Sequence, residues 1–384
     1  MAAKWEQFCR LKAFVRHYHR KKPSIQSFPE IISNYKHEQI TDIIDVRTPN
    51  EFHEDHIPGA VNIPVLSNEE RVIVGTVYSK SAFEARKLGA SLISKNISEH
   101  LKNYFYQRSQ DYSPLVYCWR GGQRSYSLGL VLAQIGFQIY MLDGGYKHYR
   151  ETVREDLKSL PYKFQYRIIS GLTGSGKTHI LHALGAQGHQ ILDLEGLARH
   201  KGSVLGLWHG ETQPSQKFFE TQICDRLQNF VTDRPVWLES ESVRIGNVFI
   251  PPDLFQSLKE SPRFCVCLPL AERVKHIIKD YPNWIENKEQ LKEILGKLIG
   301  RQSKEVVNSW IEMISRNQWE EFVERMLLEH YDPTYSLSQK KNNVSQHDVV
   351  HINVVNLNED TVFNVASKLA ELGSMNVSSV HMAA

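Results

Sequence analysis

Short hydrophobic runs alternate with helix-spaced stretches along the first part of the chain. Apolar runs at residues 41–47 and 115–117 have the length and composition of buried strands. Helical spacing of apolar residues follows at 126–135, and a further strand-like run at 138–142. Strand, helix and strand in this order predict a small parallel α/β domain over residues 27–150.

The second part of the chain repeats this alternation on a larger scale. A charged stretch over residues 151–165, with Pro161 near its end, predicts a helical linker between two domains. Residues 166–374 predict a second α/β domain. Its expected strands are 166–170, 235–239, 263–268 and 349–355, with a helix at 361–372 completing the same sheet. A long helical region over 271–329, rich in Lys, Glu and Trp, predicts a lid or an RNA-gripping surface. Residues 375–384 are expected to be a disordered tail.

The strand at 115–117 leads directly into a cysteine in a glycine-rich loop. The loop reads Cys118-Trp119-Arg120-Gly121-Gly122-Gln123-Arg124-Ser125. A thiol placed before a helix N-terminus and flanked by Arg120 and Arg124 is expected to favour the thiolate and to bind an anion. Such a loop is rhodanese-like and predicts that Cys118, Arg120 and Arg124 are catalytic. Its seven positions from Cys118 to Arg124 also suit a cysteine phosphatase.

A second glycine-rich loop follows the strand at 166–170. Residues 171–178 read Gly-Leu-Thr-Gly-Ser-Gly-Lys-Thr and fit the P-loop pattern, in which backbone amides cradle phosphate. Lys177 then reaches the outer phosphate and Thr178 ligates Mg²⁺. The predicted phosphate-binding residues are Gly171, Gly174, Ser175, Gly176, Lys177 and Thr178. The motif predicts a phosphate cradle without naming the molecule that carries the phosphate.

Acidic residues lie where a P-loop protein would need them. Glu239 ends the strand at 235–239 and is the candidate Mg²⁺-linked acid, with Glu241 as a weaker candidate. The mixed segment 193–203 follows another strand and is expected near the strand ends where α/β proteins bind ligands. Cys265 and Cys267 share one face of a strand and, without further ligands at suitable spacing, are expected to pack in the core rather than to hold a metal.

Composition gives no sign of a nucleic-acid binder, a disulfide-rich protein or a membrane protein. The 384 residues carry 46 Lys and Arg against 43 Asp and Glu, a net charge of +3, so bulk charge does not indicate a nucleic-acid binder. Five cysteines without framework spacing argue against disulfides and for a reducing, cytoplasmic location. No apolar run approaches the roughly 18 residues of a membrane span, so no membrane is expected as a partner.

The N-terminal arm, residues 1–26, is strongly basic. Through Lys22 it carries seven Lys and Arg residues against the single acid Glu6. The arm is either solvated or in contact with RNA. A transit peptide is disfavoured because the segment is poor in Ser and contains an acid.

Taken together and in order, these motifs resemble the bacterial tRNA 2-selenouridine synthases, in which a rhodanese domain is fused to a P-loop domain. The resemblance covers roughly Asp45 to Pro333. Besides the two loops, it runs through Asp45-Val46-Arg47, Glu51-Phe52, His56-Ile57-Pro58-Gly59-Ala60, Asn62-Ile63-Pro64, Glu70-Arg71, Val74-Gly75-Thr76, Gly144-Gly145-Tyr146-Lys147, Gln213-Pro214-Ser215-Gln216, Glu239-Ser240-Glu241-Ser242 and His330-Tyr331-Asp332-Pro333. Asp332-Pro333 by itself predicts the end of a helix.

The resemblance implies two linked reactions on wobble 2-thiouridine in tRNA. The sulfur is first alkylated by geranyl diphosphate, and selenium from selenophosphate then displaces the geranylthio group. It implies tRNA and small phosphorylated substrates as partners, no tightly bound cofactor, Mg²⁺ as a candidate ion, and a contact with the enzyme that produces selenophosphate. Among the helical residues expected to hold tRNA are Trp310, Trp319, Lys297, Arg301 and Arg316.

Two other classes of function fit parts of the sequence. One is a sulfurtransferase or cysteine phosphatase fused to a P-loop kinase. The other is a tRNA-binding scaffold whose P-loop only grips phosphate.

Overall fold

The computed structural model describes residues 25–28, 40–203, 205–206, 210–341 and 349–374. The chain divides into two compact units, residues 1–155 and 156–384, which are treated separately below. The division falls inside one helix, α6 (Gly145–Ser159), so the predicted linker 151–165 is the end of α6 together with the 3₁₀ turn η2 (Leu160–Lys163). Among the described helices, none combines the length and apolar character that crossing a bilayer requires.

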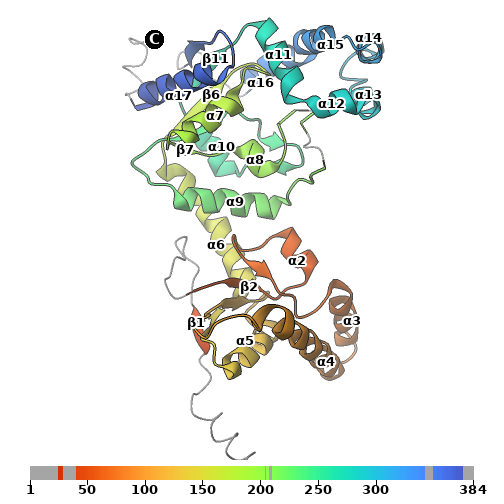
Figure 1. Ribbon diagram of the computed structural model, residues 1–384, viewed down its shortest axis with the longest axis vertical. Coiled ribbons are helices and arrows are strands. Elements are labelled where there is room, and N and C mark those ends of the chain that lie inside the picture. Colours follow the sequence, from red (N-terminus) through yellow and green to blue (C-terminus); the bar gives the residue numbers. More distant parts are fainter. Residues whose placement is uncertain (1–24, 29–39, 204, 207–209, 342–348, 375–384) are drawn as a thin grey trace, which may run out of the picture. The chain divides into compact units, whose positions relative to one another are not determined.

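Unit 1 is a parallel sheet flanked by helices, as predicted (Figure 1). In its described residues the sheet has five strands in the order β1-β5-β4-β2-β3. The strands are β1 (Ile25–Phe28), β2 (Ile43–Asp45), β3 (Val61–Asn62), β4 (Leu115–Tyr117) and β5 (Ile139–Leu142). Around them lie α2 (Pro49–Glu54), α3 (Asn68–Tyr78), α4 (Ala82–His100), the π-helical turn η1 (Leu101–Phe105), α5 (Gln123–Ile135) and α6. β2 and β4 are buried throughout, so the cysteine loop begins at the end of a strand in the core.

Unit 2 has a second parallel sheet, with the described strands in the order β12-β11-β6-β8-β7. They are β6 (Tyr166–Ser170), β7 (Gln190–Ile191), β8 (Val236–Glu239), β11 (Arg263–Cys267) and β12 (Val349–Asn353). Helices α7 (Lys177–Ala186) and α17 (Glu359–Ser374) pack on one face of this sheet, over a core that includes Trp237, Phe264 and Val266. Also in this unit are α8 (Leu194–Ala198), α9 (Gln216–Asn229), α10 (Pro252–Lys259) and the hairpin of β9 (Arg244–Ile245) and β10 (Val248–Phe249).

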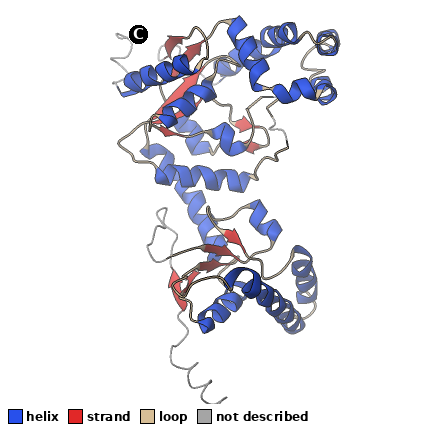
Figure 2. Cartoon of the chain, in the orientation of Figure 1, coloured by secondary structure: helices blue, strands red, loops and turns tan. Residues whose placement is uncertain are grey.

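The region after β11 is helical, as predicted, and has its own core. Its elements are α11 (Leu270–Asp280), α12 (Pro282–Glu286), α13 (Lys288–Gly296), α14 (Lys304–Ser315), α15 (Trp319–Met326), the π-helical turn η3 (Leu327–Tyr331) and α16 (Asp332–Lys341). Figure 2 shows these helices gathered beside the strands of unit 2. Leu295, Val307 and Trp310 are fully buried among them, so the region is a packed subdomain, and its role as a lid or an RNA-binding surface stays a prediction.

Several local predictions differ from the structure. Ile25 and Gln26, assigned to the basic arm, belong to β1, while the rest of the arm and the tail lie outside the described residues. Asp332-Pro333 does not end the helical region: α16 begins at Asp332, directly after the π-helical turn η3. Cys265 and Cys267 do not pack in the core but are half-buried on the opposite face of β11.

Candidate functional site

Cys118 lies between the end of β4 and the start of α5. Its Sγ accepts hydrogen bonds from the Gly122 N–H, at 3.3 Å, and from the Ser125 hydroxyl, at 3.2 Å. The side chain is buried. The sulfur therefore lies at the N-terminus of α5, within hydrogen-bond distance of two donors.

A glycine turn after β5 fixes the cysteine loop from the other side. The N–H of Tyr146 donates to the Cys118 carbonyl at 2.8 Å, and the N–H of Lys147 donates to the Trp119 carbonyl at 2.9 Å. Gly145 has φ +61°, and a Cβ there would come within 2.5 Å of the Gly121 nitrogen. The turn can approach this closely only because position 145 carries no side chain.

A buried polar network supports this turn. The Arg47 guanidinium bonds to the Asp45 carboxylate at 2.6 Å and to the Asp55 carbonyl at 2.6 Å, and it lies 3.8 Å from the centre of the Tyr146 ring. The Tyr146 hydroxyl donates to Asp55 at 2.6 Å. Asp45 and Arg47 therefore support the cysteine loop indirectly: they hold Tyr146, whose N–H bonds to the Cys118 carbonyl.

The two arginines of the loop differ in their surroundings. Arg124 donates to both carboxylate oxygens of Glu51, at 2.7 and 3.2 Å. Arg120 is exposed. The structure therefore gives Arg124 a protein partner and leaves Arg120 as the more accessible cation. Their predicted role in holding an anion stays a prediction.

The P-loop of unit 2 occupies the turn from β6 into α7. The Lys177 ammonium donates to the Gly171 carbonyl at 3.2 Å, and the Gly171 N–H donates to the Tyr335 hydroxyl at 3.1 Å. Gly171 has φ +146°, and a Cβ there would lie 2.7 Å from the carbonyl oxygen of Val266 on β11. The Ser175 hydroxyl is buried without a hydrogen-bond partner among the described residues, as expected of a group that meets a ligand.

Three glutamates gather beside Lys177. Glu239 ends β8, Glu241 follows it and Glu195 lies on α8, and their carboxylate oxygens come within 4.8 Å of one another. Burial and mutual repulsion raise the pKa of Glu195 to about 10 and that of Glu241 to about 8, and burial also raises the pKa of Glu239. Burial opposes the charge on Lys177, but the carboxylates nearby prevail and raise its pKa.

This cluster fits a divalent cation. The Thr178 side chain bonds to Glu239, whose Oε1 is buried and otherwise unpartnered among the described residues. Mg²⁺ in such proteins takes carboxylate oxygens together with substrate phosphates. Glu239, Thr178 and the two further glutamates would hold the ion, which would supply positive charge beside a bound phosphate.

The P-loop opens into a cavity of about 650 Å³, within the usual range for small-molecule sites. Its polar end carries Lys177, Thr178 and the three glutamates. The helical subdomain supplies much of the rest of the wall, where apolar side chains predominate beside a smaller number of polar ones, among them Asp280, Arg301 and Gln302. That wall includes Ile277, Tyr281, Trp284, Trp319, Phe322, Val323 and Met326. A ligand with an anionic head and an apolar body matches this distribution.

Each of the two units matches the model of a known protein family. The family model described as the tRNA 2-selenouridine synthase AAA domain matches residues 164–356, half of the chain. The chain belongs to the tRNA 2-selenouridine synthase family. A rhodanese-like domain model matches residues 28–152.

Curated relatives carry the same family name. A tRNA 2-selenouridine synthase of Nitrosomonas europaea is 38% identical over 63% of this chain and 63% of its own length. One of Hydrogenovibrio crunogenus is 30% identical over 78% of this chain and 89% of its own. One of Sulfurovum sp. is 29% identical over 83% and 93%. The match thus spans just under two thirds of the Nitrosomonas relative and most of the other two.

Some expected site residues lie elsewhere than sequence reasoning placed them. Trp310 is fully buried and its indole N–H donates to Glu329 at 3.0 Å, so its expected stacking on RNA is wrong. Trp319 is half-buried and lines the cavity. Lys297, Arg301 and Arg316 are exposed. The helical spacing of Trp310 in α14 was a signal for the core, since indole rings at this period usually pack inward.

Sequence reasoning also missed residues of the site. Glu195 was only part of a mixed segment, yet it belongs to the glutamate cluster because α8 turns back toward the end of β8. The apolar side chains named in the cavity wall come from three helices, α11, α12 and α15, and from Tyr281 between the first two, and no local motif marks them.

Proposed function

We propose that this protein replaces the 2-thio sulfur of wobble uridine in tRNA with selenium. In the first step geranyl diphosphate alkylates the sulfur at the P-loop unit. In the second, selenium from selenophosphate replaces the geranylthio group with the help of Cys118. Membership of the tRNA 2-selenouridine synthase family supports the overall reaction.

One observation carries the assignment of geranyl diphosphate to the P-loop. The phosphate end of the cavity, at Lys177 and Thr178, is continuous with walls formed by Trp284, Phe322 and Met326. A ribose would leave its hydroxyl groups against this apolar surface, whereas a geranyl chain gains free energy by leaving water there. The cavity therefore favours a prenyl diphosphate over a nucleotide.

In the alkylation step, the thiocarbonyl sulfur attacks C1 of the geranyl chain. The new S–C bond forms as the C–O bond to diphosphate breaks, diphosphate leaves with the electron pair, and the uracil N3–H proton is lost. Charge develops on the departing diphosphate. Lys177 and the P-loop amides are arranged to stabilise that charge.

In the selenium step, the Cys118 thiolate attacks the phosphorus of selenophosphate. An S–P bond forms while the P–Se bond breaks, and selenium leaves with the electron pair as selenide. Selenide then adds to C2 of the S-geranyl base and geranylthiolate leaves. Water hydrolyses the S–P bond and restores the thiol. The Gly122 N–H and the Ser125 hydroxyl, both on the sulfur, support the thiolate that this step needs.

The test of the first step uses purified full-length protein, a 2-thiouridine tRNA, geranyl diphosphate and Mg²⁺, with nucleosides analysed by mass spectrometry. Lys177→Ala is expected to slow S-geranylation by about 30- to 1,000-fold, the equivalent of roughly 2–4 kcal/mol of lost charge stabilisation. Lys275→Ala, at an exposed lysine of the same unit, is the matched control. Unchanged geranyl transfer in Lys177→Ala would show that the P-loop serves another ligand.

A second variant tests the apolar wall. Trp284→Ala should raise KM for geranyl diphosphate while leaving inhibition by inorganic diphosphate unchanged, because only the chain contacts the indole. Equal weakening of both would contradict the assignment of the wall to the geranyl chain. Competition by ATP as strong as that by geranyl diphosphate would favour a nucleotide site.

A further inference from the structure

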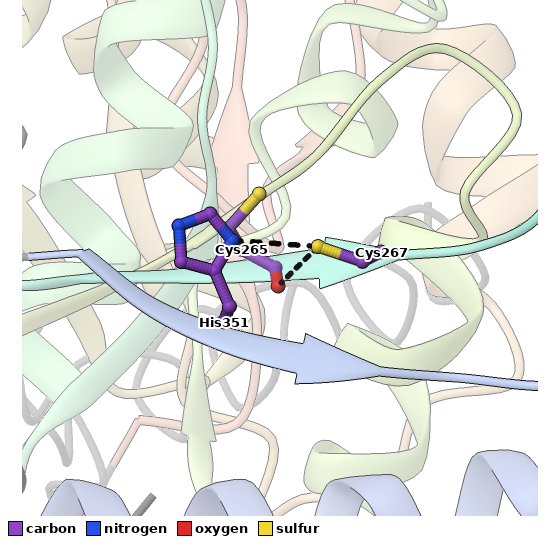
Figure 3. Close-up of side chains that lie close together, drawn as sticks. All are labelled: Cys265, Cys267 and His351. Atoms are coloured by element: carbon purple, nitrogen blue, oxygen red, sulfur yellow. Dashed lines mark hydrogen bonds between the residues drawn. The ribbon is translucent and has the colours of Figure 1, made fainter.

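Two cysteines and a histidine meet on the edge of the sheet in unit 2, outside the cavity just described (Figure 3). Cys265 and Cys267 lie on β11, and His351 lies on the edge strand β12. The two strands are parallel, and Cys265 is in register with His351. Residues two apart on a strand point to the same face, so the pairing brings all three side chains together.

This face of the two strands is the one that leaves the core. Phe264, Val266, Val350 and Ile352 alternate with the three side chains and are buried on the opposite face. Cys265 and Cys267 are half-buried and His351 is exposed. An ion or small ligand can therefore reach the three side chains from solvent, whereas a purely structural packing role would place them among the apolar residues.

The distances between the donor atoms suit one metal ion. Cys267 Sγ lies 3.4 Å from His351 Nδ1, and the three donor atoms all lie within 4.8 Å of one another. Tetrahedral zinc with Zn–S of about 2.3 Å and Zn–N of about 2.0 Å requires donor separations of roughly 3.5–3.8 Å. Small side-chain rotations would bring the three atoms to that spacing.

We propose that Cys265, Cys267 and His351 form a zinc site with one coordination position open to solvent. Two thiolates and an imidazole select a borderline-soft ion such as Zn²⁺ over Mg²⁺, which takes oxygen ligands. No fourth His, Cys, Asp or Glu joins the group among the described residues, so water or an external ligand completes the tetrahedron. Three-ligand zinc sites of this kind keep an open position, unlike closed structural sites.

The site bridges β11 to the edge strand, close to the P-loop. Cys265 is also in register with Ser170, the residue before Gly171. Zinc binds cysteine as the thiolate, so its binding at Cys265 and Cys267 would release protons. Because the ion would bind the folded sheet but not an equivalent arrangement in the unfolded chain, zinc should stabilise unit 2.

The test titrates Co²⁺ into the reduced, metal-free, full-length protein and follows the absorption of cobalt. The wild type is expected to bind one equivalent with thiolate-to-cobalt charge transfer and tetrahedral d–d bands, and to lose both on addition of Zn²⁺. His351→Gln, at an exposed position, should weaken binding by more than about tenfold without unfolding the protein, as judged by circular dichroism. Cys267→Ser should remove most of the charge-transfer band.

Two matched controls separate this site from other thiols and imidazoles. Cys118→Ser, in unit 1, and His53→Gln, at an exposed histidine of α2, should leave the cobalt spectrum unchanged. Zinc should raise the Tm of the wild type and of both controls, but not of His351→Gln. Cobalt binding without thiolate charge transfer, or a spectrum that survives His351→Gln and Cys267→Ser, would overturn the proposal.

Discussion

Arg124 of the cysteine loop donates two hydrogen bonds to Glu51, which lies 73 residues earlier in the chain. Glu51 also closes the capping box of α2, where its carboxylate accepts from the Thr48 N–H. Burial alone would raise the pKa of Glu51, but the guanidinium of Arg124 prevails and lowers it. The pair thus ties the cysteine loop to the first helix of the unit.

A double-mutant cycle should measure this link. Glu51→Gln, Arg124→Gln and the double variant are expected to give a coupling free energy of about 1 kcal/mol in urea unfolding at neutral pH. Since the folded-state pKa of Glu51 lies below its unfolded value, this stabilisation is present above roughly pH 4.3 and is lost as the pH falls through the folded pKa. Additive free energies at neutral pH would mean that the pair contributes nothing.

Cys118→Ser should abolish selenium incorporation, because a serine hydroxyl is not significantly ionised at neutral pH and is a poor nucleophile. S-geranyl-2-thiouridine should still form and accumulate, since the P-loop unit is intact. Nucleoside mass spectrometry of tRNA from cells that carry each variant decides it, with Cys224→Ser as the cysteine control. Wild-type levels of 2-selenouridine with Cys118→Ser would remove Cys118 from the chemistry.

The free energy of unfolding should depend on pH because His276, which lines the cavity, has a lowered pKa. Burial and the His179 ring, 4.8 Å away between centroids, lower the pKa of His276 to about 4. The unfolded chain binds a proton at about pH 6.5, so stability should fall as the pH drops from 6.5 toward 4. His276→Gln should reduce the loss between pH 7.5 and pH 5 by about 1 kcal/mol, allowing for partial exposure. Urea unfolding at both pH values measures this, and a loss as large in His276→Gln as in wild type would contradict it.

Affinity for tRNA should fall steeply with salt, because several phosphates are neutralised by Lys and Arg. Removing residues 1–22, which lie outside the described part of the chain, should flatten the slope of log K against log salt by about one unit per lost contact. Trp310→Phe should leave binding unchanged, since the indole is buried. Filter-binding titrations at several salt concentrations check this. Salt-independent binding, or none, would favour the sulfurtransferase or phosphatase classes of function.

Local sequence was enough to predict the two loops and most of the strands beside them. The runs 115–117 and 166–170 became β4 and β6 because their short apolar stretches are buried on both faces of a parallel sheet. Each loop follows its strand and precedes a helix, an arrangement that depends on neighbouring residues only. The same local patterns were sufficient for the parallel α/β fold of both units.

Tertiary structure alone decided which distant side chains meet. Glu195 joins Glu239, the helical subdomain supplies the apolar cavity wall, and His351 reaches Cys265 across two paired strands. These contacts join residues tens of positions apart, so no local period encodes them. The sequence by itself determined the phosphate cradle and the thiol loop, because both are made of consecutive residues. The shape of the cavity and the approach of His351 to the two cysteines depended on how the sheet and helices pack.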